Sequence, residues 1–344
     1  MGKDTKVLGI DLAKDIFQIH GTTRQGKKTL SKRLSRTKLL SFMRNMKPCL
    51  VGIEACTGSN YWARVFEDCG HEVKIMAPQF VKPFVKSNKN DVNDAEGISV
   101  AVTRPEMRFV SPKSVSQQDV LLLHRARELC IKSRTAQANQ IRGLLAEYGV
   151  VIAKGIASVR KLLPIMALNE DKLTHQTQQV FCRLHEQFKG YDQQVAAYDK
   201  DIAAHVTSEP ICQEIMKIEG IGPVSASAIV STIGDARQFK GGRELSAWLG
   251  LVPMQHSSGN NIRLGSIHKR GDKYLRTLLI HGARCALNYA EGKNDKKNRW
   301  AAEKKQRIGF NKAAVALANK HARIIWAMMT SGECYRVEAF PNVA

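Results

Sequence analysis

The sequence predicts an α/β amino-terminal domain followed by a mainly helical remainder, and two observations lead to this division. Short β-rich runs alternate with helix-like segments over the first eighty residues or so, whereas apolar residues then recur at helical spacing with no intervening proline. The 344 residues suffice for two modest domains or for two domains and a helical spacer. We therefore expect an α/β domain at 1–150, a helical, coiled-coil-like spacer at 151–209 and a mainly helical domain at 210–344.

The first domain begins with three β-rich runs. Residues 7–12 and 15–20 lie close enough in the sequence to pair as a hairpin, and residues 28–34 supply a third strand. The segments that follow read as a basic helix near 36–46, a strand at 50–54, a helix near 59–69 and a strand near 72–76. Three meandering strands followed by alternating helices and strands is the order of the ribonuclease H-like fold, which we expect here.

Two long helices are predicted in the middle of the chain. The first carries apolar residues at helical spacing, and a polar helix rich in glutamine and histidine follows near 170–206. Helices of this kind pack as a hairpin or pair with another subunit. Most of their cations are expected on a solvated face, but Arg125, Arg134 and Arg142 are candidates to follow a nucleic-acid backbone. The apolar residues are Leu121, Leu122, Leu129, Ile141, Leu144 and Leu145.

The charge of the chain points to a polyanionic partner. Lysine and arginine outnumber aspartate and glutamate by 53 to 31, which gives a formal net charge of +22. Between residues 263 and 323 there are sixteen basic residues against four acidic ones. Such a surplus attracts nucleic acid, the commonest large polyanion in a cell. A basic protein without such a partner and one that binds acidic membrane remain the alternatives on composition alone.

Cysteine usage and hydropathy narrow the class of protein. The eight cysteines are scattered, with no Cys-x-x-Cys pair and no histidine at ligand spacing. This pattern argues against a zinc site and against a disulfide framework, and it fits a reducing compartment. The chain shows no apolar signal region and no run of about 18 apolar residues. We expect a cytoplasmic protein with no membrane partner.

Four carboxylates form the first candidate site. Asp11 and Glu54 each come directly after an apolar strand, and in the expected fold these two strands are neighbours. Asp91 and Asp94 are spaced for one face of a helix. Oxygen ligands without imidazole or thiolate favour Mg²⁺ or Mn²⁺, and two such ions about 4 Å apart assist phosphoryl displacement. Singly, Asp11 could be a turn residue, and Asp91 or Asp94 could cap a helix.

The carboxy-terminal region offers two further motifs. The run IMKIEGIGPVSASAIVSTIG at 215–234 resembles a helix–hairpin–helix unit, in which Gly220 and Gly222 would let backbone amides approach a phosphate. A plain helix connector is the alternative. Ser257 and Ser258 precede a glycine in a basic loop, where a turn is the ordinary explanation. The cations that could hold phosphates around a serine hydroxyl are Arg263, Lys269, Arg270 and Arg276.

Nearly the whole chain resembles a known family, the DEDD-type insertion-sequence transposases that act as bridge-RNA-guided serine recombinases. The shared motifs in the first half are G-I-D-x-A-K at 9–14, G-I-E-A-C-T-G at 52–58, K-N-D-V-N-D-A-E at 89–96 and R-T-x-x-x-N-x-I-R-G-L-L-A-E-Y-G at 134–149. Those in the second half are I-E-G-I-G-P, F-x-x-x-R-E-L-S-A-W-L-G-L-V-P at 239–253 and S-S-G followed by L-G-x-I-x-K-R-G-D-x-Y-L-R.

The resemblance implies a RuvC-like domain whose acidic quartet falls on Asp11, Glu54, Asp91 and Asp94. It also implies a transposase domain whose nucleophile is the serine directly before glycine, Ser258, with Ser257 as the second choice. Attack of that hydroxyl on a DNA phosphodiester would leave a covalent phosphoserine linkage, which conserves bond energy for rejoining. The metal cluster would offset charge at the transferred phosphate.

The partners that the resemblance implies are donor and target DNA, a structured non-coding guide RNA that pairs with them, and further copies of the chain in a homo-oligomer. The residues themselves leave two other functions open. One is a metal-dependent, structure-specific nuclease of the junction-resolvase kind, in which Ser258 is structural. The other is a nucleic-acid-binding scaffold without catalytic activity, whose carboxylates only cap helices.

Overall fold

The computed structural model describes residues 5–86, 90–259 and 261–337, so that Lys89 of the third motif lies outside the described residues. The chain forms two compact units, Met1–Ser114 and Val115–Ala344. The division between them falls just before the first long helix, which therefore belongs to the second unit. The predicted borders at 150 and 209 remain predictions.

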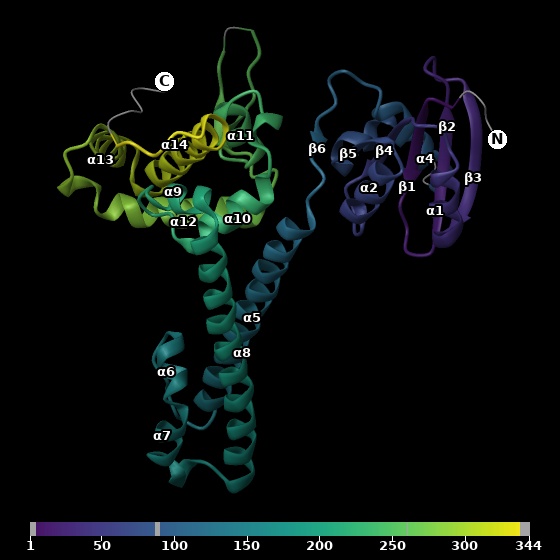
Figure 1. Cartoon of the computed structure of the whole chain (residues 1–344). Coiled ribbons are helices and arrows are strands. Elements are labelled where there is room, and N and C mark those ends of the chain that lie inside the picture. Colours follow the sequence, from purple (N-terminus) through teal and green to yellow (C-terminus); the bar gives the residue numbers. More distant parts are fainter. Residues whose placement is uncertain (1–4, 87–89, 260, 338–344) are drawn as a thin grey trace. The chain divides into compact units, whose positions relative to one another are not determined.

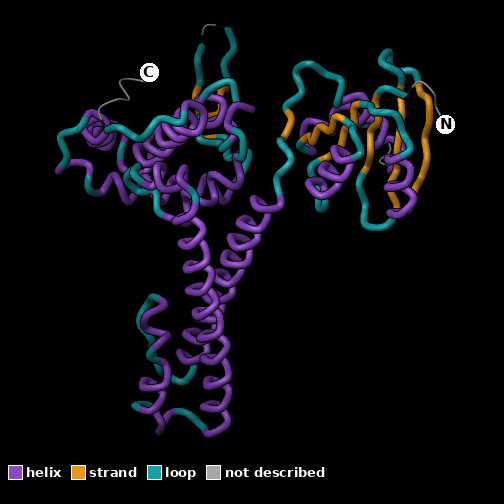
Figure 2. Tube along the Cα trace, viewed as in Figure 1, coloured by secondary structure: helices purple, strands orange, loops and turns teal. Residues whose placement is uncertain are grey.

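A six-stranded mixed sheet forms the first unit (Figures 1 and 2), which confirms the α/β prediction. Its order is β3-β2-β1-β4-β5-β6, with β1 antiparallel to β2 and parallel to β4, and with β5 parallel to β4. The arrangement is consistent with a ribonuclease H-like domain. The strands are β1 Val7–Asp11, β2 Ile16–Thr22, β3 Lys28–Ser35, β4 Leu50–Glu54, β5 Glu72–Met76 and β6 Phe109–Val110.

Alternation along the strands gives the sheet two different faces. Leu8 and Ile10 of β1 belong to a core with helices α1 (Arg36–Arg44) and α2 (Ser59–Asp68). Val7 instead packs with Ile98 of helix α4 (Asp91–Ala101), on the opposite face. Successive side chains of a strand point to opposite faces, so one face packs against α1 and α2 and the other against α4. The short elements α3 (Pro78–Val81) and η1 (Lys82–Phe84) precede α4.

The second unit begins with a helical hairpin. Helices α5 (Val115–Ala146) and α8 (His175–Ser208) lie side by side along much of their length (Figure 1), which confirms the prediction of two long helices. The segment between them forms α6 (Ile156–Arg160), α7 (Leu162–Ala167) and η2 (Glu170–Lys172). Salt bridges cross the hairpin from Arg127 to Asp199 and from Arg134 to Asp192, each at 2.6 Å.

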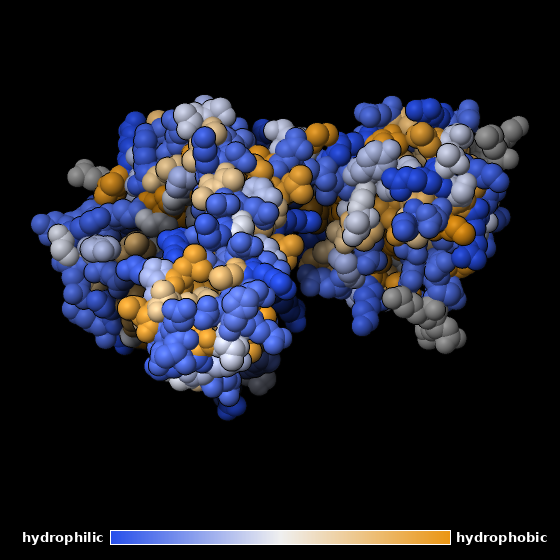
Figure 3. Space-filling view, turned by 90° about the horizontal axis from the view of Figure 1, so that it is seen from below, coloured by the Kyte–Doolittle hydropathy of each residue, from blue (hydrophilic) through white to orange (hydrophobic). Residues whose placement is uncertain are grey.

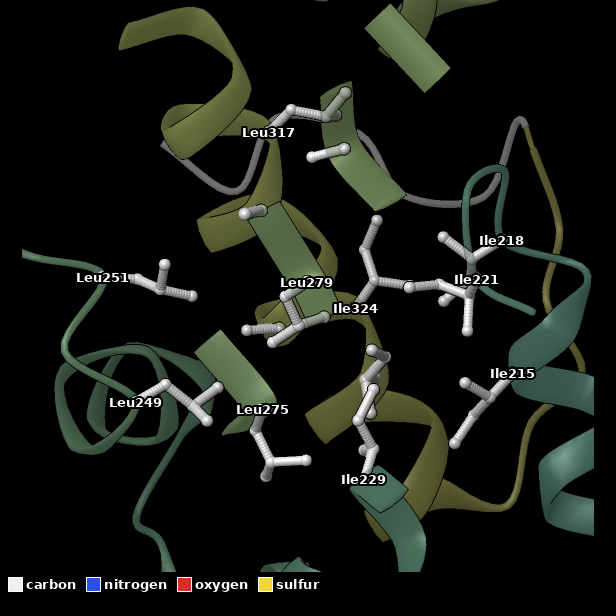
Figure 4. Close-up of a cluster of buried hydrophobic side chains, with 14 of the residues drawn as sticks. Ile215, Ile218, Ile221, Ile229, Leu249, Leu251, Leu275, Leu279, Leu317 and Ile324 are labelled. Carbon is white, nitrogen blue, oxygen red and sulfur yellow. The ribbon is translucent and has the colours of Figure 1, made fainter. Parts of the chain in front are cut away.

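The rest of the second unit is mainly helical, as predicted, and surrounds a large apolar core (Figure 4). Leucines and isoleucines from several helices meet there, including Ile229, Leu279 and Ile324. One two-stranded hairpin projects from this core. The elements are α9 Pro210–Met216, α10 Pro223–Ile233, η3 Ala236–Gln238, α11 Gly242–Trp248, β7 Pro253–Gln255, β8 Leu264–Ile267, α12 Lys273–Asn288, η4 Ala290–Gly292, α13 Lys296–Ile308 and α14 Phe310–Ser331.

Polar residues dominate the surface. Figure 3 shows hydrophilic residues over most of the visible face, with hydrophobic residues between them in smaller patches. Within the described part of the chain, no helix combines the length and the apolar character that a membrane span requires.

Candidate active site

Asp11 and Glu54 end two adjacent parallel strands. The register of β1 and β4 pairs Gly9 with Gly52 and Ile10 with Ile53, so the next step along both strands brings Asp11 beside Glu54. Both residues are partly buried. Asp11 and Glu54 are the last residues of strands that have a neighbouring strand on each side. The backbone at these positions is therefore fixed, which suits a metal ligand that must keep its position.

Two glycines determine which face the carboxylates share. A Cβ added at Gly9 would lie 2.3 Å from the Ala95 carbonyl oxygen, so only glycine lets the α4 backbone approach β1 this closely. A Cβ at Gly52 would lie 2.7 Å from Val102, directly after the same helix. Residues two apart on a strand share a face. Each glycine stands two residues before a carboxylate, so both carboxylates lie on the α4 face.

Helix α4 brings its acidic first turn to the same end of the sheet. Its middle packs on Gly9, and its last residues pack near Val7, so the helix runs antiparallel to β1 and begins where the strand ends. Asp91 and Asp94 lie in this first turn. The cap is Asn90, whose side chain accepts a hydrogen bond from the amide of Asn93 at 2.8 Å. Neither aspartate therefore acts as the cap.

Asp91 has a partner that the sequence did not indicate. Arg33 of β3 donates to its carboxylate at 3.2 Å, and the two side chains are 64% and 58% exposed. Ion pairs this exposed are worth about 0–1 kcal/mol, so Asp91 can leave Arg33 at little cost. No short-range pattern predicts this contact, because the two residues are brought together only when β3 joins the sheet.

The Cys56 thiol lies close to both strand-end carboxylates. Its sulfur lies 4.0 Å from the Leu12 carbonyl oxygen, so the segments that follow β1 and β4 meet here. Burial raises the pKa of Cys56, and the negative charges of Glu54 and Asp11 raise it further. Burial and these two negative charges therefore all favour the protonated thiol.

The donor set at this edge fits a hard divalent cation. Asp11, Glu54, Asp91 and Asp94 supply only carboxylate oxygens, the ligands that Mg²⁺ and Mn²⁺ prefer. Among the described residues, however, no three His, Cys, Asp or Glu side chains are close enough together to hold a metal ion. Like charges repel one another, and Asp91 here pairs with Arg33. The structure thus gathers the four residues at one end of the sheet without closing them into a ligand shell.

The two candidate serines differ sharply in their hydrogen bonds. Both lie in the exposed turn that joins β7 to β8. The Ser257 hydroxyl oxygen accepts from the Arg263 amide at 3.2 Å and from the Gln255 side chain at 3.0 Å, which holds the hairpin together. The Ser258 backbone bridges to Asn261, and its hydroxyl has no partner among the described residues. Only the Ser258 hydroxyl is thus available to react without loss of structure.

The cations near this hairpin separate into two groups. Arg263, Lys269 and Arg270 are exposed, as contact with nucleic acid requires. Arg276 is only 8% exposed, and its Nη1 donates to the carbonyls of Leu249 at 3.0 Å and of Arg270 at 3.1 Å. The Arg276 guanidinium is thus used inside the fold to hold the loop before α12, and its contact with nucleic acid stays a prediction.

The cations of α5 divide in the same way. Arg125 is exposed and Arg142 partly so, with a bond from Arg142 to the side chain of Asn139 in the same helix. Arg134 is 17% exposed and bound to Asp192 of α8, which Arg160 also contacts at 2.7 Å. Arg134 thus pairs within the helical hairpin, and its contact with nucleic acid stays a prediction.

The predicted helix–hairpin–helix unit corresponds to α9, a glycine-containing turn and α10. A Cβ at Gly220 would lie 2.1 Å from the Gly282 carbonyl oxygen, so Gly220 serves the close crossing of this turn with α12. Its role in exposing amides to phosphate stays a prediction. Gly222 differs, because it lies at the N-terminal end of α10 with open space where its Cβ would be.

Comparison with known proteins adds two family matches and several full-length relatives. Residues 8–150 match a DEDD model described as transposase, and residues 212–300 match the model described as transposase IS116/IS110/IS902 family. A probable family 20 transposase of Pseudomonas aeruginosa is 45% identical over 96% of this chain and 98% of its own length. The transposase for insertion sequence element IS1111A of Coxiella burnetii is 44% identical, over 98% of this chain and 93% of its own length. The transposase for IS1328 of Yersinia enterocolitica is 37% identical over 96% and 98%.

Proposed function

Since this chain belongs to the IS116/IS110/IS902 family of transposases, we propose that it excises and inserts the DNA of a mobile element through an acidic metal site and a serine nucleophile. The observation that carries the proposal is the shared α4 face of Asp11 and Glu54. Two unrelated motifs each place a glycine two residues before a carboxylate, and both glycines admit one helix whose first turn is acidic.

A divalent ion bound at this edge would stabilise negative charge on a phosphate in transfer. The residues of the chain would hold and position this ion. The sheet fixes Asp11 and Glu54, and the first turn of α4 supplies Asp91 and Asp94, of which Asp91 must leave Arg33. Since that ion pair is exposed and weak, its release does not limit assembly of the site.

In the proposed reaction, the Ser258 hydroxyl oxygen attacks a DNA phosphorus. The new Oγ–P bond forms as one bond from phosphorus to a deoxyribose oxygen breaks, the hydroxyl proton leaves, and the departing strand oxygen takes up a proton. No bond energy is lost to water, so the reverse attack by another strand rejoins the DNA. The free Ser258 hydroxyl and the exposed cations Arg263, Lys269 and Arg270 support this role.

We propose donor and target DNA as the substrates, a structured guide RNA as the source of target choice, and a homo-oligomer as the working form. The net charge of +22 supports contact with nucleic acid. The guide RNA and the oligomer rest on the family resemblance. Recognition by base pairing would leave the protein to bind RNA shape and backbone.

A plain metal-dependent nuclease is the second candidate, because all four carboxylates belong to the first compact unit. Such a site needs only water as nucleophile. Replacing Ser258 with alanine separates the two functions: the nuclease would continue to cut DNA, whereas the recombinase would lose strand exchange. Ser257→Ala is the matched control, expected to weaken the hairpin but keep some strand exchange. Equal loss in both variants would contradict the assignment to Ser258.

The acidic residues are tested with isosteric variants. Asp11→Asn and Glu54→Gln keep shape but remove charge, and each is expected to abolish Mg²⁺-dependent DNA processing. Asp15→Asn, in the exposed segment between β1 and β2, is the control and should process DNA normally. Intact metal-dependent processing in the Asp11 and Glu54 variants would leave a scaffold whose carboxylates have only structural roles.

A further inference from the structure

The strand opposite Asp11 carries a buried glutamine whose role neither the fold nor the proposed chemistry explains. The antiparallel register of β1 and β2 pairs Gln18 directly with Asp11, so the two side chains stand on the same face of the sheet, beneath α4. Gln18 is only 3% exposed. Its neighbours Phe17 and Ile19 fill the apolar core on the other face. A carboxamide has thus been buried where an apolar side chain would pack.

The orientation of this carboxamide is fixed by its partners. Its Nε2 donates to the Ile19 carbonyl at 3.2 Å and to the Ser31 hydroxyl at 3.0 Å. A backbone carbonyl can only accept, so the nitrogen must face Ile19 and the amide cannot be turned round. The oxygen Oε1 is buried without a hydrogen-bond partner among the described residues. The two donors of the amide are therefore satisfied, while its acceptor is left open.

A buried open acceptor requires a partner, because leaving it unsatisfied costs about as much as a lost hydrogen bond. The residues beside Gln18 on the two neighbouring strands indicate which kind of partner its oxygen would have. Asp11 flanks Gln18 on one side, and Arg33, which holds Asp91, flanks it on the other. Gln18 thus stands between Asp11 and the arginine that pairs with Asp91. An amide oxygen is itself a ligand for hard cations and accepts from their bound water.

We propose that Gln18 is a fifth oxygen donor of the acidic site and holds the divalent cation, directly or through one of its water molecules. The inference rests on the proposed function of the carboxylates as metal ligands. Ser31 and the Ile19 carbonyl keep the amide nitrogen turned away, so that the oxygen is presented in advance. Gln18 is a positioning residue for the cation and takes no part in proton transfer.

Mn²⁺ binding to the full-length protein, measured by isothermal titration calorimetry, tests this without any reaction. Gln18→Leu is expected to weaken Mn²⁺ binding at least tenfold, the usual loss for a residue that supports a metal ligand. Gln18→Glu keeps an oxygen and adds charge, so it is expected to bind Mn²⁺ at least as tightly as the wild type. Thr22→Val, buried on the same face of β2 but opposite Val7, is the matched control and should bind Mn²⁺ normally.

Melting temperatures in the absence and presence of Mn²⁺ separate metal binding from folding. Without metal, Gln18→Leu loses two hydrogen bonds but also a buried unsatisfied acceptor, so its melting temperature should stay near that of the wild type. The increase of its melting temperature on addition of Mn²⁺ should be smaller than in the wild type. Gln18→Glu should melt lower without metal, because two carboxylates then face each other, and should rise more with Mn²⁺. A rise in Gln18→Glu no larger than in the wild type would overturn the proposal.

The result that distinguishes Gln18 from the carboxylates comes from Asp11→Asn. If Asp11→Asn loses Mn²⁺ while Gln18→Leu binds like the wild type, Gln18 is only a buried polar residue and the acidic site stands. If Asp11→Asn binds Mn²⁺ like the wild type, the acidic site itself fails, and the role of Gln18 with it.

Discussion

Replacing Gly9 with alanine should disturb the acidic site without touching any acidic residue. The new Cβ would stand 2.3 Å from the Ala95 carbonyl oxygen, whereas real Cβ contacts stay at about 3.0 Å or more. Helix α4 must therefore withdraw from β1 by about 0.7 Å, and its first turn moves with it. Overpacking of this kind costs about 1–3 kcal/mol. A displacement near 1 Å in a catalytic constellation costs about 100-fold in rate.

Peptide-resolved hydrogen exchange measures the destabilisation of the contact between α4 and β1, and Mg²⁺-dependent DNA processing measures the loss of rate. Amides of β1 and α4 should lose protection corresponding to about 1–3 kcal/mol, while those of α5 and α8 stay unchanged. Gly143→Ala is the matched control. It lies in helix α5 with open space around the added Cβ and should gain about 0.5–1 kcal/mol.

If Gly9→Ala keeps wild-type protection in α4 and processes DNA at the normal rate, the position of α4 does not depend on Gly9. Gly9 does not have a positive φ, so backbone strain cannot produce the loss. The effect must come from the approach of the helix alone.

Three further changes test other parts of the structure. Arg276→Met should destabilise the second unit by about 2–4 kcal/mol, because the carbonyls of Leu249 and Arg270 lose their donor, and urea unfolding should shift toward lower urea concentrations. Asp192→Asn should loosen the helical hairpin by about 1–3 kcal/mol, since the half-buried Arg134 loses its counter-charge; unchanged exchange of α5 and α8 amides would argue against this. Burial lowers the pKa of His124 to about 4, so the fold favours the neutral ring, and unfolding takes up a proton below pH 6.5. Stability should therefore fall by about 3 kcal/mol between pH 6.5 and pH 4, and His124→Gln should flatten this slope.

The sequence predicted the strands of the first unit nearly to the residue. Predicted runs at 7–12, 28–34 and 50–54 correspond to Val7–Asp11, Lys28–Ser35 and Leu50–Glu54. The strands β1 and β4 are largely buried runs bounded by polar residues, a strong local pattern, so prediction succeeds there. The pairing of β6 with β5 escaped notice, because a strand of two residues, Phe109 and Val110, is specified by its neighbour and has no pattern of its own.

The sequence predicted that Asp11 and Glu54 end neighbouring strands, and β1 and β4 do pair, while the role of these residues as metal ligands stays a prediction. Their shared face was not predicted, because it depends on the close approach of α4 to Gly9 and Gly52, which is visible only in the folded unit. The sequence could not indicate partners that lie far away along the chain. Arg276 donates to the carbonyls of Leu249 and Arg270, and Gly220 packs on Gly282, contacts that form only when the second unit folds.

Trapping the covalent intermediate tests directly whether Ser258 becomes linked to DNA during strand exchange. The protein is incubated with Mg²⁺, DNA carrying the ends of the element and RNA transcribed from its non-coding flank, then digested and examined by mass spectrometry. We expect a nucleotide adduct on the peptide that contains Ser257 and Ser258, located on Ser258 and absent from Ser258→Ala and from Asp11→Asn. DNA cleavage that proceeds without any adduct, or with an adduct on Ser257, would contradict it.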